Sequence, residues 1–529
     1  MNEELEHQLF STPAGSQWKK IGARNHHGIC VPLFSLHTEQ STGVGEYLDL
    51  IPLIGWCHEV GMDVIQLLPL NDTGLGSSPY SAISATALNP VHLSLSQLPD
   101  IDKIAHYREK LAQMRYWNST SRVKYNIVRE LKNSFLRDYF AHFFSEVSES
   151  TEYKNFLLHN KWLKPYALFK AIKEQQEWRP WEEWPLPLKS PSETGYQDLL
   201  VEFGNSIHFH EFSQYFCFSQ LEKVKKTAED ANILLKGDIP ILISRDSADV
   251  WHHRHYFLLH LSAGAPPDMY TRDGQHWGFP VYDWEELEKD DFSWWHERLE
   301  LASRLYHLYR IDHIVGFFRL WAIASGKIAK EGSFIPPEED QWIPHGRKIM
   351  KMMLRSAPIL PIGEDLGLVP PEVKKCLTEL GICGTRMMRW ERRWETDGKF
   401  TPPSEYPPAS MTTVSTHDSD TLQLWWRHFP KEARLYSEFK EWPYKPFLSN
   451  ESLQEILRDS HHSGSLFHIN LLQEYLALYP ELISHNPADE RINIPGKILA
   501  RNWTYRFRPT VEELVKHIPL KEAVKKILQ

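Results

Sequence analysis

This chain has few cysteines, no excess of basic charge and no long apolar runs. Five cysteines occur in 529 residues, and no pair has CxxC spacing, which is typical of reduced structural thiols. The formal net charge is −10, which argues against nucleic acid or an anionic membrane surface as the main partner. No apolar run approaches membrane-spanning length, and the N-terminus lacks the features of a secretory signal. We therefore expect a cytoplasmic protein.

Tryptophan, by contrast, is abundant. The 20 tryptophans are explained mostly by core packing, but indole faces also stack on the apolar faces of sugar rings. The composition therefore raises the expectation of a carbohydrate site without establishing one.

Eight short aliphatic or aromatic runs predict strands. They occupy residues 29–36, 63–70, 233–243, 308–315, 359–365, 384–390, 412–418 and 491–496. Helix-like segments lie between most of them, and this alternation predicts an α/β fold of the (β/α)8, or TIM, barrel type. We expect residues 1–529 to form a single catalytic domain.

One connection is too long for a loop. Residues 91–224 contain helical patterns and a Trp/Pro-rich patch. We interpret this segment as an inserted, mostly helical subdomain.

Acidic residues occur at the ends of three predicted strands: Asp312, Glu364 and Asp418. The C-terminal ends of barrel strands form the active-site face. Arg310 precedes Asp312 by two residues and so lies on the same strand face, where a cation keeps a carboxylate ionised. One ionised and one protonated carboxyl group suit glycoside cleavage. Retention of configuration would require the two groups to lie roughly 5–5.5 Å apart.

Each of these acids also has a purely structural explanation, because carboxylates at strand ends often cap the next turn or helix. Other polar motifs in the chain give little support for a different kind of site. HFH at 208–210 and WHHRH at 251–255 lack a partner at metal-ligand spacing. DSD at 418–420 resembles the DxD of nucleotide-sugar transferases, but no Gly-rich phosphate loop follows the first strand.

Three motifs together resemble a known family. RIDHIVGFFRLW, GEDLG and STHDSDT occur in that order, as in the amylomaltases, also called 4-alpha-glucanotransferases or disproportionating enzymes. Blocks at 43–90, 236–251, 264–284 and 493–503 are similar to further parts of that family. The first motif is closer to the plant cytosolic disproportionating branch, although the starch-binding modules of that branch are missing.

The resemblance implies a retaining transfer of 1,4-alpha-glucan segments. It makes Asp312 the nucleophile and Glu364 the acid and base, while Asp418 holds hydroxyl groups of the ring that is cleaved. It also implies further substrate contacts at Arg310, His417, Asp246, Tyr80 and Asn502.

Residues 264–284 match the mobile loop that covers the cleft in this family, and Asp268, Gln275 and Trp277 would face acceptor subsites. Met269-Tyr270 replaces the Tyr-Phe pair of many members, which leaves the preferred acceptor open. The implied substrates are maltodextrin, maltose, glucose or glycogen, with no cofactor or metal. A plain alpha-glucan hydrolase and a non-catalytic glycan-binding protein remain alternatives.

Overall fold

The central sheet is built from eight parallel strands. The structure is a computed structural model that describes residues 3–267 and 272–529. The strand order is β11-β8-β3-β2-β1-β14-β13-β12. The two outer strands meet through a parallel bridge between Ile362 and Cys383, where Gly363 N–H donates to the Cys383 carbonyl at 2.7 Å. The sheet is thus nearly closed on itself, and the predicted (β/α)8 barrel is confirmed.

The barrel strands are short, as is common in this fold. In chain order they are β1 (His26–Val31), β2 (Val64–Leu67), β3 (Leu234–Ile239), β8 (Leu308–Ile311), β11 (Leu360–Gly363), β12 (Gly384–Met387), β13 (Ser410–Thr413) and β14 (Phe467–Leu471).

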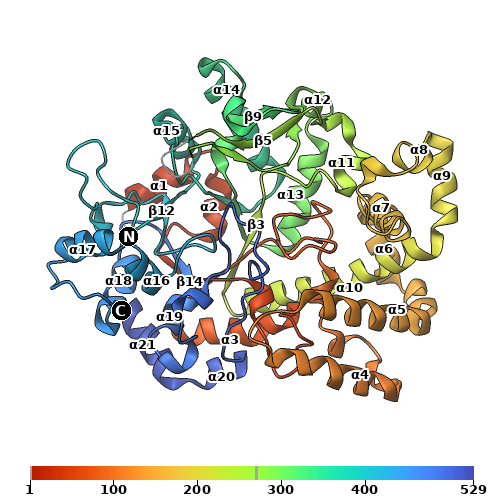
Figure 1. The fold of residues 1–529 in the computed structure, drawn as a ribbon, viewed down its shortest axis with the longest axis horizontal. Coiled ribbons are helices and arrows are strands. Elements are labelled where there is room, and N and C mark those ends of the chain that lie inside the picture. Colours follow the sequence, from red (N-terminus) through yellow and green to blue (C-terminus); the bar gives the residue numbers. More distant parts are fainter. Residues whose placement is uncertain (1–2, 268–271) are drawn as a thin grey trace.

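Helices surround the barrel (Figure 1). Those outside the long β2–β3 connection are α1 (Glu3–Phe10), α2 (Gly15–Ile21), α3 (Leu50–Val60), α11 (Ala248–His252), α12 (Trp284–Lys289), α13 (Ser293–Leu305), α14 (Glu339–Ser356), α15 (Pro371–Leu380), α16 (Leu422–His428), α17 (Pro430–Phe439), α18 (Asn450–His461), α19 (Leu472–Leu476), α20 (Val511–Lys516) and α21 (Ile518–Leu528).

Local sequence explains where several of these helices begin and end. Helix α15 begins at Pro371, a residue whose fixed φ suits the first helical turn, and ends before Gly381, which has a left-handed φ of 77°. The carboxyl end of α3 is terminated in the same way by Gly61 at φ 87°. After both helices the chain therefore turns back sharply towards the next barrel strand.

The eighth predicted strand is wrong. The chain at 491–496 is irregular, and β14 occupies this place in the barrel instead. Two polar side chains interrupt the apolar pattern of β14, and each makes an internal hydrogen bond. His468 Nδ1 lies 2.8 Å from the Ser460 carbonyl, and Asn470 Oδ1 accepts from Val414 N–H at 2.9 Å. The other seven predictions overlap observed strands, although 412–418 extends five residues beyond the end of β13.

The connection between β2 and β3 is rich in helices. It contains α4 (Ala105–Arg115), α5 (Tyr125–Glu149), α6 (Thr151–His159), α7 (Leu163–Gln175), α8 (Leu186–Lys189), α9 (Glu193–Glu202) and α10 (Gly204–Asp230). Figure 1 shows these helices, orange to yellow, on the side of the barrel opposite both termini. We refer to residues 91–224 as the insertion.

A small antiparallel sheet with the order β10-β9-β5-β6 adjoins the barrel. Its strands are β5 (Leu261–Ala265), β6 (Gln275–His276), β9 (Leu320–Ala324) and β10 (Ser333–Ile335). A separate pair consists of β4 (Phe257–Leu258) and β7 (Val281–Tyr282). The described parts of residues 264–284, which we call the lid segment, are thereby attached to β5 and β4.

Candidate active site

Arg310 lies at the centre of the site, one residue before the end of β8. Its Nη2 atom is 2.7 Å from Asp312 Oδ1 and 3.9 Å from Glu364 Oε2, while Nη1 is 3.0 Å from Asp238 Oδ1. These three carboxylates raise the pKa of the buried guanidinium well above its ordinary value, although burial itself acts to lower it. A cation that remains charged therefore joins acids from three strand ends.

The two acids at the ends of β8 and β11 are close together. Because Asp312 Oδ1 and Glu364 Oε2 share one nitrogen of Arg310 at 2.7 Å and 3.9 Å, these oxygens can be no farther apart than the two distances combined, about 6.6 Å. This bound includes the roughly 5–5.5 Å expected for a retaining pair and excludes most of the inverting range. Both side chains are partly open to solvent, 28% for Asp312 and 18% for Glu364.

A local turn of the backbone orients Glu364. His313 directly follows Asp312 and adopts a left-handed φ of 45°, and its N–H donates to Glu364 Oε2 at 3.0 Å. Leu366 N–H donates to Oε1 at the same distance. Burial raises the pKa of Glu364 to about 7, and Asp312 adds to this rise, so together they outweigh Arg310 and the two backbone donors. Glu364 can therefore carry a proton near neutral pH.

Asp418 is held by residues from two segments. Asn493 Nδ2 donates to Asp418 Oδ1 at 2.7 Å, and His417 Nε2 lies 3.4 Å from Oδ2. Burial acts to raise the pKa of Asp418, but His417, Asn493 and Arg310 outweigh it and lower the pKa to about 2. The side chain is 44% exposed. Asp418 is therefore ionised at neutral pH and partly open to solvent.

Tyr80 joins this group from the loop after β2. Its hydroxyl donates to Asp238 Oδ2 at 2.7 Å, and its ring stacks on His417 with centroids 5.2 Å apart. Trp503 packs against both rings, at 5.5 Å from Tyr80 and 5.8 Å from His417. The aromatic cluster thus lies beside Asp418 and the Asp238–Arg310 pair.

The lid segment reaches the same region. Trp277 meets the His313 ring edge-on at 5.1 Å, next to the predicted nucleophile. Its Nε1 donates to Gln275 Oε1 at 3.1 Å. The predicted subsite residue Asp268 and the Met269-Tyr270 pair lie outside the described residues.

Two predicted contact residues are engaged elsewhere. Asp246 accepts from Lys173 Nζ at 2.6 Å and from Trp181 N–H at 3.1 Å, both in the insertion. Asn502 donates to the carbonyl groups of Ile494 and Lys497, and its side chain therefore fixes the loop that carries Asn493. The structure thus gives both residues a supporting position rather than a place among the acids around Arg310.

Comparison with known proteins identifies the family. The family model described as 4-alpha-glucanotransferase matches residues 31–512. The chain belongs to this family. A 4-alpha-glucanotransferase of Chlamydia pneumoniae is 48% identical over 98% of both chains. A 4-alpha-glucanotransferase of Oryza sativa subsp. japonica is 26% identical over 95% of this chain and 69% of its own length.

A solved structure supports the same assignment. An amylomaltase from Streptococcus agalactiae, solved in complex with acarbose, aligns with a TM-score of 0.83 at 25% identity, over 95% of this chain and 98% of its own. This chain is thus an enzyme of the 4-alpha-glucanotransferase class on a (β/α)8 barrel. No helix in the described part of this 4-alpha-glucanotransferase is long and apolar enough to cross a membrane.

Sequence reasoning missed two polar residues of this 4-alpha-glucanotransferase site. Asp238 lies inside the apolar run 233–243, directly opposite Arg310 in the β3–β8 register. A charged residue inside a buried strand was the signal that singled out Asp312, and it applied equally to Asp238. Asn493 was missed because residues 491–496 were assigned to a strand, whereas this loop carries an amide to Asp418.

Proposed function

We propose that this 4-alpha-glucanotransferase works by a double displacement in which Asp312 is the nucleophile and Glu364 is the acid and base. The observation that carries the proposal is that one guanidinium nitrogen lies 2.7 Å from Asp312 and 3.9 Å from Glu364, while the pKa of Glu364 is raised to about 7. Two neighbouring carboxyl groups in different protonation states are what a retaining glycosidic transfer requires.

In the first step, an Asp312 oxygen attacks the anomeric carbon of the donor glucan. The bond from that carbon to the leaving O4 atom breaks, and the Glu364 proton passes to that oxygen. A covalent glucosyl ester and a shortened glucan result. In the second step, Glu364 takes the proton from the 4-hydroxyl of an acceptor, whose oxygen displaces Asp312. Two inversions at the same carbon give net retention.

Asp418 and His417 would bind hydroxyl groups of the ring that is cleaved. An ionised carboxylate strengthens a hydroxyl hydrogen bond as positive charge develops on the ring. The low pKa of Asp418, about 2, and its partial exposure support this role. Tyr80 and Trp503 supply the aromatic wall beside it.

Transfer rather than hydrolysis depends on how the intermediate partitions between a sugar and water. A tenfold preference needs only about 1.4 kcal/mol of difference between the two barriers. Gln275 and Trp277 are our candidates for an acceptor site that binds sugar and excludes water, because Trp277 contacts His313 next to Asp312. Asp268 is proposed for the same site from its sequence motif.

The proposed substrates are maltodextrins, with maltose, glucose or glycogen as acceptors. We also propose a cytoplasmic location, which the five unpaired, buried cysteines support. Product analysis on maltotriose tests the activity. Glucose together with longer oligomers is expected. Products no longer than maltose would indicate a hydrolase, and no turnover would indicate a binding protein.

The acid role has its own test. In Glu364→Gln, formation of the glucosyl ester should be impaired far less on glucosyl donors whose leaving groups need no protonation, such as glucosyl fluoride, than on maltotriose. The second step, which needs Glu364 as base, should slow for both donors. Equal slowing of ester formation on glucosyl fluoride and on maltotriose would contradict the assignment of Glu364 as the proton donor.

A further inference from the structure

We propose that the insertion positions Tyr80 by holding both ends and the middle of the loop 71–89, and that Lys170, Tyr166 and Gln214 are positioning residues for the nucleophile. This inference rests on the proposed function, since it takes Asp312 as the nucleophile. It gives the insertion a role in the chemistry, although none of its residues named here contacts Asp312, Glu364 or Asp418.

The first end of the loop is fixed at Asp72, which is only 2% exposed. Its Oδ2 atom accepts from Tyr166 Oη at 2.6 Å and from Lys170 Nζ at 2.5 Å, both on α7. Its Oδ1 atom accepts from Gly74 N–H at 3.0 Å. Lys170 is also buried, with 9% exposed. An ion pair this far from water tolerates little displacement of either partner.

The second end is fixed at Leu88 by Gln214 of α10. The Gln214 amide accepts from Leu88 N–H at 2.9 Å and donates to the Leu88 carbonyl at 2.7 Å, so it pairs with the backbone as a neighbouring strand would. The two ends also meet each other, because Asp72 N–H donates to the Ala87 carbonyl at 2.9 Å. The insertion therefore holds the loop 71–89 at the place where its two ends meet.

The middle of the loop is covered as well. Arg129 of α5 donates to the carbonyl groups of Leu75 and Gly76, each at 2.9 Å. Gly74 has a left-handed φ of 57°, and a Cβ there would lie 2.7 Å from the Trp178 ring. The insertion thus packs directly on the backbone that leads to Tyr80.

From Tyr80 a continuous series of contacts reaches the nucleophile. The Tyr80 hydroxyl donates to Asp238 at 2.7 Å, Asp238 pairs with Arg310 at 3.0 Å, and Arg310 pairs with Asp312 at 2.7 Å. If the loop shifts, Asp238 loses its hydroxyl donor and can draw Arg310 away from Asp312. The expected consequence is a lower kcat rather than weaker donor binding alone.

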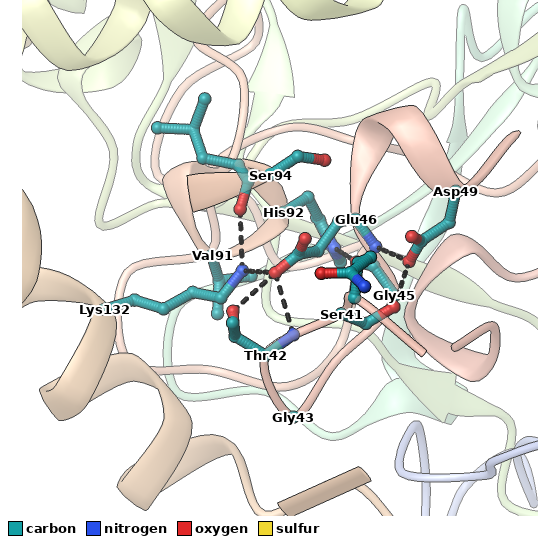
Figure 2. Close-up of polar contacts among 12 residues, drawn as sticks. Ser41, Thr42, Gly43, Gly45, Glu46, Asp49, Val91, His92, Ser94 and Lys132 are labelled. Atoms are coloured by element: carbon teal, nitrogen blue, oxygen red, sulfur yellow. Dashed lines mark hydrogen bonds and ion pairs between the residues drawn. The ribbon is translucent and has the colours of Figure 1, made fainter. Parts of the chain in front are cut away.

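A second buried lysine of the insertion offers a matched control. Lys132 of α5 is 1% exposed and donates to Glu46 Oε1 at 2.7 Å and to the Leu93 carbonyl at 2.8 Å. Figure 2 shows Lys132 reaching Glu46 among Thr42, Asp49 and Ser94. This pair also joins the insertion to a barrel loop, but that loop does not carry Tyr80.

The experiment compares Lys170→Met with Lys132→Met, each in the wild-type and Tyr80→Phe backgrounds. Glucose release from maltotriose gives kcat and KM, and thermal unfolding gives the midpoint of each variant. We expect Lys170→Met to lower kcat about tenfold and Lys132→Met less than about twofold. In the Tyr80→Phe background, Lys170→Met should cause no further loss, because its effect passes through that hydroxyl group.

Equal losses in the two lysine variants, or a Lys170→Met loss that multiplies with that of Tyr80→Phe, would overturn the proposal. If Lys170→Met does not fold, Arg129→Leu replaces it, since Arg129 is only half-buried and its removal leaves no buried charge. Its smaller loss, about threefold, should likewise vanish in the Tyr80→Phe background. A transferase and a hydrolase both release glucose from maltotriose, so failure of the proposed function is read separately, from the wild-type products.

Discussion

Arg310 Nη2 lies only 3.9 Å from Glu364 Oε2, yet Glu364 has a raised pKa. A neighbouring cation ordinarily lowers the pKa of a carboxyl group. Burial, with a further contribution from Asp312, outweighs that effect here and raises the pKa to about 7. The arrangement lets Glu364 keep its proton up to about neutral pH, and this sets the pH range in which the enzyme should work.

The alkaline side of the pH profile should therefore report Glu364. Because the first step needs Glu364 protonated, kcat/KM should fall as the pH rises through about 7. Initial rates on maltotriose between pH 5 and 9 provide the measurement. In Glu364→Gln the residual activity should lack this decline, and an unchanged profile in that variant would show that another group is responsible.

Replacing the proposed nucleophile should lower kcat far more than replacing any residue around it. Asp312→Asn preserves the size of the side chain but removes the attacking charge, so kcat should fall by roughly 10⁴ or more. The circular dichroism spectrum should remain that of the wild type. A variant that retained a tenth of the activity would rule out the nucleophile role.

Asn493 offers a milder change, next to Asp418. Its amide donates to Asp418 at 2.7 Å, and Asn493→Ala should let that carboxylate rotate away from the sugar hydroxyl groups. We expect kcat to fall about tenfold, since charge-assisted hydrogen bonds are typically worth about 1.5–3 kcal/mol. Steady-state kinetics on maltotriose measure this, and Asn502→Ala, which disturbs the same loop without touching Asp418, is the control.

Trp277 of the lid segment should control how the glucosyl ester partitions between water and sugar, rather than the overall rate of turnover. Trp277→Ala opens space next to His313 and admits water near the glucosyl ester. The ratio of hydrolysis to transfer should rise about tenfold, which corresponds to about 1.4 kcal/mol between the two barriers. Chromatography of maltotriose products gives the ratio. If total activity fell while the ratio stayed constant, Trp277 would have no part in the acceptor site.

Acid stability should depend on buried histidines. Burial lowers the pKa of His92 to about 4 from its ordinary 6.5, so the unfolded chain binds a proton at a pH where the folded chain does not. The contribution of neutral His92 is fully present above pH 6.5 and is lost as the pH falls towards 4. The gap in unfolding free energy between wild type and His92→Gln should therefore shrink over this range, by on the order of 1–3 kcal/mol. Urea denaturation at several pH values measures it, and a constant gap would contradict the assignment.

The sequence was most informative where a charged residue that the chemistry needs lies within or at the end of an apolar strand. Arg310, Asp312 and Glu364 interrupt or end apolar strands, and such interruptions are visible in the sequence. β14 was hidden for a related reason, because His468 and Asn470 break its apolar pattern while bonding to Ser460 of α18 and to the Val414 backbone just after β13. Contacts such as Asn493 with Asp418 depend on how distant loops meet, and no local pattern specifies that.

The buried cysteines have a practical consequence. All five thiols are shielded from solvent, so a maleimide dye should find little to label in the native enzyme. Ile498 is fully exposed on the loop that carries Asn493 and Asn502. An Ile498→Cys enzyme would thus accept a single fluorophore on the loop that also carries the Asp418 partner Asn493, and its emission should report glucan arrival in real time.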